Sequence, residues 1–275
     1  MEKQHKSEKR VTQSERQSHS EQASEGAGKL YVVATPIGNL GDISARALAV
    51  LAQIDLVAAE DTRTTGHLLA HHGIGAKLVA LHEHNERERA VELVARMRAG
   101  KTIALVCDAG TPGISDPGAL LVACAMEAGI TVCPIPGANA AIAALSAAGL
   151  AAPHFLFYGF LPAKSAGRRS ALAALRELPY ALVFYEAPHR VTECVADLAA
   201  TLGGMREIVI ARELTKLFEA IHRCRLDEAS DWLAADSNRQ RGEFVLIVSG
   251  AREEKLEGLP AEAERVLRLL TRNFR

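Results

Sequence analysis

Residues 108–118 (DAGTPGISDPG) form the segment of the sequence that is best suited to carry chemistry. Three glycines and two prolines give this loop a defined shape, and glycine lets the backbone approach a ligand closely. The loop follows an apolar run and leads into a stretch with helical character. Ser115 or Asp116 can cap that helix and leave amide groups free to bind a carboxylate. The loop therefore predicts a binding site for a small ligand.

Two other loops share this character, residues 35–42 (TPIGNLGD) and residues 135–141 (IPGANAA). Each of them could be only a tight connection. All three loops, however, follow predicted strands, and open α/β sheets bind ligands at the carboxyl ends of their strands. The three loops together favour one shared crevice.

Two familiar nucleotide-binding motifs are incomplete in this chain. Residues 73–78 (GIGAKL) lack the third glycine of a dinucleotide-binding fingerprint. Residues 100–102 (GKT) resemble the end of a phosphate-binding loop, but Ala95 stands where its first glycine belongs, and a strand is expected to follow. An ordinary Rossmann-type cofactor site is therefore not expected.

The run His82-Glu83-His84-Asn85-Glu86 offers a different chemistry. Its two imidazoles, two residues apart at a strand end, could lie on one face as metal ligands. No HExxH motif accompanies them, and polar residues at a strand's carboxyl end more often face a substrate. We therefore predict no metal site here and expect a substrate-facing edge.

The alternation of apolar runs and amphipathic stretches predicts two α/β domains that position these loops. The first domain, residues 29–150, should hold a mostly parallel sheet. Its expected strands are Lys29–Thr35, Asp55–Glu60, Leu78–His82, Lys101–Cys107 and Ile130–Pro136, with helices between them that include Asp116–Gly129, and a further helix over Ala138–Gly149.

The second domain, residues 151–250, should follow a hinge near Ala151–His154. Two neighbouring strands late in this domain suggest a partly antiparallel sheet. The expected strands are Phe155–Phe160, Ala181–Glu186, Glu207–Glu213, Leu217–Arg223 and Glu243–Ser249, with helices around Arg168–Glu177, Arg190–Thr201 and Leu226–Ala235.

The two ends of the chain differ from its middle. Residues 1–28 are polar and charged and are expected to be a disordered tail, whereas residues 251–275 are expected to be part of a helical segment that begins at Pro260. The net charge of −1 neither suggests nor excludes RNA. The five cysteines form no CxxC pair, and no secretory signal or membrane span is recognisable, so we expect free thiols and a cytoplasmic protein.

The sequence resembles the tetrapyrrole-methylase-like class of methyltransferases over much of its length. The matching segments are TPIGNLGD (35–42), AEDTR (59–63), HEHNE (82–86), DAGTPGISDPG (108–118), IPGANAAIAALSAAGL (135–150), FYGFLP (157–162), FYEAPHR (184–190) and ARELTK (211–216). Within that class, the chain is most similar to enzymes that methylate the ribose 2′-oxygen of a cytidine in the decoding region of 16S ribosomal RNA. Cys107 and Cys224 stand where serine and glycine are expected.

The resemblance implies the tetrapyrrole methylase fold, with S-adenosylmethionine bound in a cleft between two α/β domains. The positions that match the family's cofactor loops are Pro36, Asp108, Gly110, Thr111 and Ala140, while Glu186, Leu214, Phe244 and Val245 should approach from the second domain. The resemblance also implies a homodimer that acts on 16S ribosomal RNA, with the small ribosomal subunit as its expected context.

Transfer to a ribose hydroxyl needs a group that removes the proton of the hydroxyl. The candidates are Asp61, Glu83, His84 and Glu186, with Glu60 beside them. The basic residues expected to contact RNA are Arg63, Lys164, Arg168, Arg169, Arg190 and Lys216. Two other functions stay open at this point: a tetrapyrrole or protein methyltransferase of the same fold, and an inactive RNA-binding protein.

Overall fold

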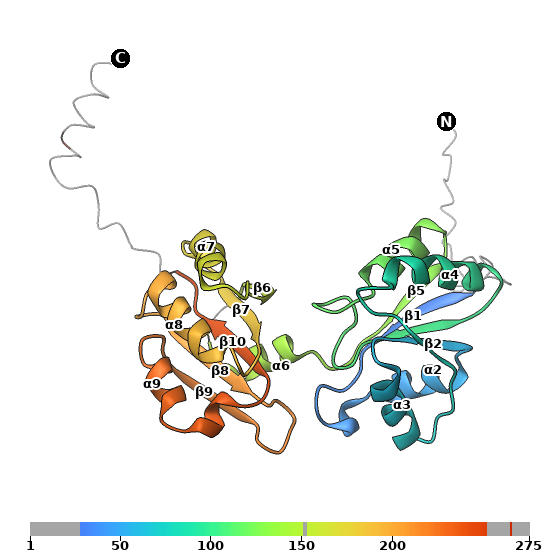
Figure 1. Cartoon of the computed structure of the whole chain (residues 1–275), viewed down its shortest axis with the longest axis horizontal. Coiled ribbons are helices and arrows are strands. Elements are labelled where there is room, and N and C mark those ends of the chain that lie inside the picture. The colour runs from blue at the N-terminus through green and yellow to red at the C-terminus, as the bar shows by residue number, and fades with distance from the viewer. Residues whose placement is uncertain (1–27, 151–152, 252–264, 266–275) are drawn as a thin grey trace, which may run out of the picture. The chain divides into compact units, whose positions relative to one another are not determined.

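The computed structural model describes residues 28–150, 153–251 and 265 (Figure 1). It consists of two compact units. The first contains the described residues up to Ala143 together with Glu213–Glu219, and the second contains the remainder. The division falls inside helix α6 (Ala140–Ala147) and not at the predicted boundary after residue 150. The segment Glu213–Glu219, which the sequence pattern places in the second domain, belongs to the first unit.

The first unit contains a five-stranded sheet in the order β3-β2-β4-β1-β5, and every pair of strands in it is parallel. Its strands are β1 (Lys29–Val33), β2 (Leu56–Ala59), β3 (Leu78–Ala80), β4 (Ile103–Val106) and β5 (Thr131–Ile135). All five predicted strands and the parallel sheet are confirmed. β2 and β4 are buried along their whole length, as expected when helices cover both faces of a parallel sheet.

Successive side chains of a strand point to opposite faces, so β4 serves two cores. Leu105 packs with α4 (Glu86–Arg98) and α5 (Ala119–Glu127). Val106 packs with α2 (Ala45–Gln53) and α3 (Thr62–His71) on the other face. A short 3-10 helix, η1 (Leu40–Asp42), follows β1. These layers bring the carboxyl ends of the parallel strands to one edge of the sheet.

The second unit contains a mixed sheet in the order β6-β7-β10-β8-β9. Its strands are β6 (Phe155–Phe160), β7 (Ala181–Glu186), β8 (Glu207–Arg212), β9 (Ala220–Arg225) and β10 (Phe244–Val248). Only β6 and β7 are parallel among these neighbours, which confirms the predicted partly antiparallel sheet. Its helices are α7 (Ser165–Leu175), α8 (Val191–Leu202), α9 (Ala229–Ala234) and the 3-10 helix η2 (Ser237–Gln240).

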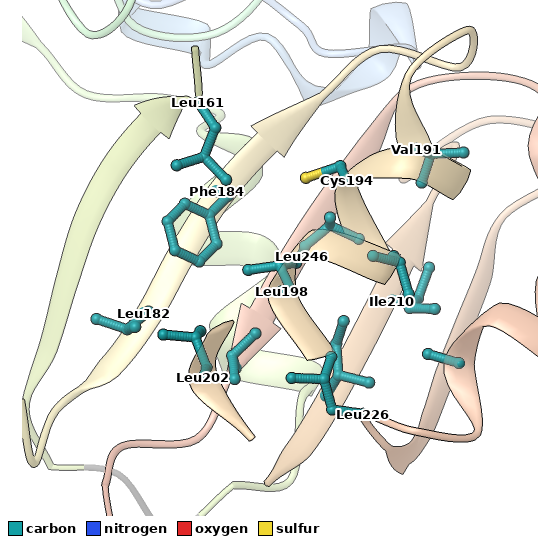
Figure 2. Packing of buried hydrophobic residues seen from close by; sticks show 14 of the residues in the cluster. Leu161, Leu182, Phe184, Val191, Cys194, Leu198, Leu202, Ile210, Leu226 and Leu246 are labelled. Atoms are coloured by element: carbon teal, nitrogen blue, oxygen red, sulfur yellow. The ribbon is translucent and has the colours of Figure 1, made fainter. Parts of the chain in front are cut away.

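One face of this sheet packs against the helices. Phe184, Ile210 and Leu246 from three strands meet Leu198 and Leu202 of α8 in a continuous apolar core (Figure 2). Burial of such side chains stabilises the fold by about 1.5–3 kcal/mol each relative to exposure. The packed sheet therefore holds the polar loops at its end in defined positions.

A few predicted boundaries were wrong. The strand expected over Leu217–Arg223 begins only at Ala220, and the helix expected from Asp116 begins at Ala119. The predicted N-terminal tail and C-terminal helix lie outside the described residues, apart from Gly28 and Arg265. The five cysteines are free thiols, of which Cys107 and Cys194 are buried. In the described part of the chain, no helix is long and apolar enough to cross a membrane.

Candidate functional site

The three predicted ligand loops of the first unit touch one another. Thr35 and Gly110 form an antiparallel bridge, in which the Thr35 N–H donates to the Gly110 carbonyl at 2.8 Å and the Gly110 N–H donates back at 3.1 Å. The Thr111 hydroxyl donates to the Ala138 carbonyl at 3.2 Å. Pro36 is buried beside the bridge, and Ala140 is the first residue of α6. The loops after β1, β4 and β5 therefore form one assembly.

The loop 108–118 takes a shape that ordinary residues would resist. Gly110 and Gly113 have φ values of +88° and +78°, and Ser115 has +66°. These values lie in the left-handed region, which costs residues with a Cβ free energy. A Cβ added at Gly110 would lie 3.5 Å from the Ile37 side chain and 3.8 Å from the Ala138 carbonyl. A side chain at Gly110 would therefore lie in contact with the neighbouring loops and would be strained by the φ of its backbone.

The amide groups at the start of α5 are not free, so one prediction needs correction. The N-cap residue is Gly118, and neither Ser115 nor Asp116 caps the helix. Instead, Oε1 of Glu86 accepts the amide hydrogens of Gly118 and Leu120 at 2.9 Å each. A carboxylate does bind this helix terminus, but it is the protein's own.

Carboxylates at the ends of the neighbouring strands β2 and β4 accept hydrogen bonds from backbone N–H groups at the end of the other strand. Oε2 of Glu60 accepts from the Asp108 N–H at 3.3 Å, and Oδ1 of Asp108 accepts from the Asp61 N–H at 3.0 Å. Asp61 also caps α3 and forms an ion pair with Arg63 at 2.7 Å. The predicted residues Asp61, Asp108 and Arg63 are therefore close together in the first unit.

The negative charges of the carboxylates near these strand ends are not all balanced by neighbouring positive charges. Burial and the negative charge of Glu60 raise the pKa of Asp116 from 3.8 to about 6. Burial also raises the pKa of Asp108. Hydrogen bonds from Arg63, in contrast, lower the pKa of Asp61 to about 2. Asp108 and Asp116 thus lie where a further positive charge would be stabilising.

The HEHNE run is a turn that leads into α4. The Asn85 side chain accepts from the His82 N–H at 2.9 Å and donates to the Ala80 carbonyl at 3.2 Å. Glu83 and His84 are exposed, and the rings of His82 and His84 lie 6.0 Å apart. Asn85 therefore shapes the turn and leaves Glu83 and His84 accessible.

The segment Glu213–Glu219 packs on the loop after β1. The Asn39 N–H donates to Thr215 Oγ1 at 3.1 Å, and a Cβ on Gly38 would come within 2.5 Å of the Lys216 side chain. Lys216 pairs with Glu213 at 2.9 Å, and Leu214 is 9% exposed. Leu214 is therefore a cofactor candidate that lies in the first unit. Gly38, whose backbone lies close to the Lys216 side chain, is a residue that the sequence analysis did not single out.

The candidates Glu186, Phe244 and Val245 lie in the second unit, where they are 2%, 2% and 4% exposed. Phe244 is paired in register with Glu186. Oε1 of Glu186 accepts from the Ala187 N–H at 2.9 Å and lies 3.2 Å from Nε of Arg190. Burial, together with the Glu186 carboxylate, raises the pKa of the Cys194 thiol. Glu186 thus faces the underside of α8 and holds the turn after β7.

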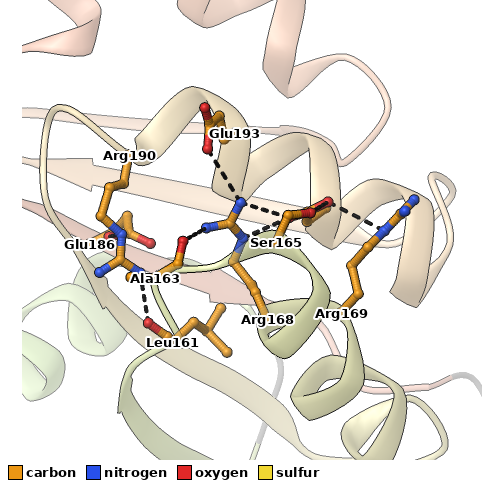
Figure 3. Close-up of polar contacts among 9 residues, drawn as sticks. Leu161, Ala163, Ser165, Arg168, Arg169, Glu186, Arg190 and Glu193 are labelled. Atoms are coloured by element: carbon orange, nitrogen blue, oxygen red, sulfur yellow. Dashed lines mark hydrogen bonds and ion pairs between the residues drawn. The ribbon is translucent and has the colours of Figure 1, made fainter.

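The basic cluster at α7 needs a second correction. Arg168 is only 1% exposed, and its guanidinium binds Asp197 at 2.7 Å and the Ala163 carbonyl at 3.2 Å (Figure 3). A buried guanidinium that is already paired does not reach a phosphate, so Arg168 is no direct RNA contact. Arg169 is 56% exposed and lies 3.3 Å from Asp197, while Lys164 is exposed.

The fold and the strand-end loops define a class of methyltransferases. A family model described as Tetrapyrrole (Corrin/Porphyrin) Methylases matches residues 29–230, and the chain belongs to this family. Solved structures with the same fold include uroporphyrin-III-C-methyltransferase from Thermus thermophilus, with a TM-score of 0.59, 21% identity and coverage of 81% of this chain and 94% of that one. The methyltransferase CobJ has a TM-score of 0.60 and 20% identity, with coverage of 82% and 95%.

Relatives with much higher sequence identity are known. The chain is 54% identical to ribosomal RNA small subunit methyltransferase I of Escherichia coli O157:H7 over 248 residues. These residues are 90% of this chain and 86% of the relative. The chain is 57% identical over 245 residues to the protein of that name from Pseudomonas aeruginosa strain PAO1, which covers 89% and 87%. The chain is therefore a methyltransferase with relatives of one consistent name.

Proposed function

We propose that this protein transfers a methyl group from S-adenosylmethionine to the ribose 2′-oxygen of a cytidine in the decoding region of 16S ribosomal RNA. The observation that carries the proposal is the identity of 54% and 57%, over about nine-tenths of the chain, to proteins named ribosomal RNA small subunit methyltransferase I. Structures of tetrapyrrole methyltransferases share the fold at only 19–21% identity and so do not argue for a tetrapyrrole substrate.

The residues of the first unit fit S-adenosylmethionine. One relative in fold was solved with S-adenosyl homocysteine bound. Here, the left-handed φ values of Gly110 and Gly113 give the loop a shape that glycine adopts most easily, and the raised pKa values of Asp108 and Asp116 suit a cation. The proposed contacts are Pro36, Asp108, Gly110, Thr111, Ala140 and Leu214 in this unit, and Glu186, Phe244 and Val245 in the second.

The bound cofactor supplies a methyl group on a sulfonium, which is transferred by in-line displacement. The chain's own task is to align the ribose oxygen and to exclude water, and alignment of reactants can lower a barrier by about 7–11 kcal/mol. A base in reach of the hydroxyl adds typically about 10²–10⁴-fold. No metal is needed for this reaction.

The structure favours Glu83 or His84 as that base over the other two candidates. Both are exposed at the carboxyl end of β3. Asp61 has a pKa lowered to about 2 by Arg63, which makes it a weak acceptor near neutral pH. Glu186 is 2% exposed, and its Oε1 atom is occupied by Ala187 and Arg190. We therefore do not assign the role of the base to Asp61 or Glu186, whose carboxylates hold the turns in which they lie.

The RNA contacts that we propose are the more accessible cations of the earlier set, without Arg168 and without Arg190, whose side chain is 19% exposed and paired with Glu186. Arg63, Lys164 and Arg169 are exposed, and Lys216 lies on the segment against Gly38. We also propose a homodimer in the cytoplasm that acts on the small ribosomal subunit. Light scattering at micromolar concentration checks the dimer, and a monomer alone would contradict it.

A methyl-transfer assay tests the proposed function. Small ribosomal subunits that lack the modification are incubated with the protein and radiolabelled S-adenosylmethionine, and the labelled nucleoside is identified. We expect label on a 2′-O-methylcytidine, and an Asp108→Ala variant serves as the control with impaired cofactor binding. Label on a base, or on no RNA while a tetrapyrrole is methylated, would refute the proposal.

A further inference from the structure

Exposed aromatic side chains gather on the edge strand β6. Phe155, Tyr158 and Phe160 are 45%, 39% and 52% exposed, although aromatic residues are only 4% of the chain. Among the described strands, β6 pairs with β7 alone. The Phe160 ring packs edge-on against Tyr185, with 5.7 Å between the ring centroids, and half of the residue is left to solvent. An exposed aromatic ring in a fixed place is a feature that binding surfaces use.

Two arginine side chains donate hydrogen bonds to the backbone of the loop that follows Phe160. Nη2 of Arg190 donates to the Leu161 carbonyl at 2.6 Å, and Nη1 of Arg168 donates to the Ala163 carbonyl at 3.2 Å (Figure 3). The guanidinium groups are themselves paired, Arg190 with Glu186 and Arg168 with Asp197. The backbone from Leu161 to Lys164 is thus ordered before any ligand arrives, which lowers the entropy cost of binding.

The charge around this loop is positive at its surface. The cluster contains four cations, Lys164, Arg168, Arg169 and Arg190, and three carboxylates, Glu186, Glu193 and Asp197. Glu186 and Asp197 are buried and Glu193 is 78% exposed, whereas Lys164 is exposed and Arg169 is 56% exposed, so the accessible side chains are two cations and one carboxylate. An exposed ring with cations beside it matches a nucleobase and its phosphates. Burying the same surface against an apolar partner would require desolvation of those cations.

We propose that Phe160 and Lys164 form a contact site for single-stranded RNA, in which the Phe160 ring stacks on a base and Lys164 pairs with a phosphate. Arg168 and Arg190 are positioning residues that fix the backbone between them. The proposal rests on the proposed function, because it assigns part of the binding surface for the same RNA substrate.

Phe155 provides a matched control, because it is the same residue type on the same strand but lies at the end away from the loop. The probe is a single-stranded oligoribonucleotide with the decoding-region sequence. We expect Phe160→Ala to weaken its binding about tenfold or more and Phe160→Trp to restore it. Phe155→Ala should change the affinity less than twofold, and S-adenosylmethionine affinity should be unchanged in all three variants. Lys164→Ala should reduce the slope of log affinity against log salt by about 0.7.

The outcomes separate this proposal from the function on which it rests. Wild-type protein that methylates small subunits, with the same KM in Phe160→Ala, would overturn the proposal alone. Equal loss of RNA affinity in Phe155→Ala would overturn it as well. A Phe160→Ala protein that falls from dimer to monomer with unaltered RNA affinity would show that the ring contacts a second copy instead. Wild-type protein that neither binds RNA nor methylates subunits would refute the proposed function and this site with it.

Discussion

Asp197 in the second unit and the pair Asp108 and Asp116 in the first unit have opposite electrostatic surroundings. In the second unit, Asp197 is paired with Arg168 at 2.7 Å and with Arg169 at 3.3 Å, and it accepts from Ser165 at 2.9 Å. In the first unit, Asp108 and Asp116 lie near other carboxylates, and their pKa values are raised. A scaffold that only has to be stable pairs its buried charges, because an unpaired one is costly.

Binding sites follow a different rule, since they keep a charge that the ligand will neutralise. The comparison teaches that basic residues that are close together in the sequence do not by themselves form a binding surface. Arg168 belongs to the framework of the second unit, while the unbalanced carboxylates of the first unit mark a place for a cationic ligand. Three predictions, ordered by expected effect, test this contrast.

Arg168→Ala should have the largest effect on stability. It leaves Asp197 buried with fewer partners, and we expect the free energy of unfolding to fall by about 3 kcal/mol. Urea denaturation followed by circular dichroism measures this. Lys164→Ala, at the exposed N-cap of the same helix, is the control and should change stability by less than about 0.5 kcal/mol. Wild-type stability in Arg168→Ala, together with a shallower salt dependence of RNA binding, would make Arg168 a phosphate contact after all.

Asp108→Ala and Gly110→Val should weaken S-adenosylmethionine binding by about tenfold or more, which corresponds to about 1.4 kcal/mol. The first removes a carboxylate that also holds the Asp61 N–H. The second forces a β-branched residue into a φ of +88°. Calorimetry decides, with Asp227→Ala in the second unit as a matched loss of a carboxylate. Unchanged affinity in both folded variants would remove this loop from the cofactor site.

Glu86→Ala should have the smallest effect in these three predictions. Loss of the carboxylate that caps α5 should lower the free energy of unfolding by about 1 kcal/mol, as for other helix caps. Cofactor affinity should not change, because the Glu86 carboxylate binds backbone N–H groups at the start of α5 and is not a proposed cofactor contact. Glu92→Ala, also on α4, removes a partly exposed carboxylate that pairs with Arg89 and Arg96, and each such surface pair should contribute less than about 0.5 kcal/mol. Altered cofactor affinity in Glu86→Ala alone would place that helix terminus in the site.

The parts of this molecule that were predictable from sequence are those with local signals. The strands of the first sheet are short apolar runs bounded by turn residues, so their existence and their parallel direction were recognisable, although their order in the sheet was not predicted. The contact between the loops after β1 and β4 also followed, because parallel strands end at one edge. The strand start at Ala220 did not, since Leu217 and Phe218 look like strand residues but follow Thr215, whose φ is +66°.

Pairings between distant residues could not be predicted from local patterns. Glu86 caps a helix that begins more than thirty positions later, and neither segment carries a signal for the other. Arg168 and Asp197 likewise lie on different helices, α7 and α8, which pack together only in the folded unit. A cluster of basic residues in sequence therefore does not reveal which guanidinium groups are already paired.

The most direct test of the contrast is the pH dependence of cofactor binding. Since the Asp116 pKa is raised to about 6, this group is mostly protonated at pH 5 and mostly ionised at pH 7. A bound cation favours the ionised form and lowers the pKa, so binding releases protons and affinity rises with pH.

The measurement is calorimetric titration of S-adenosylmethionine into the wild-type protein and Asp116→Asn at pH 5, 6 and 7. If binding returns the pKa to its ordinary value, we expect the wild-type affinity to rise about tenfold from pH 5 to pH 7. Asp116→Asn should lose most of this rise, and S-adenosyl homocysteine, which lacks the sulfonium charge, should show a smaller one. Wild-type affinity that is flat across this range, or that falls as the pH rises, would contradict the assignment of the unbalanced carboxylates to the cofactor site.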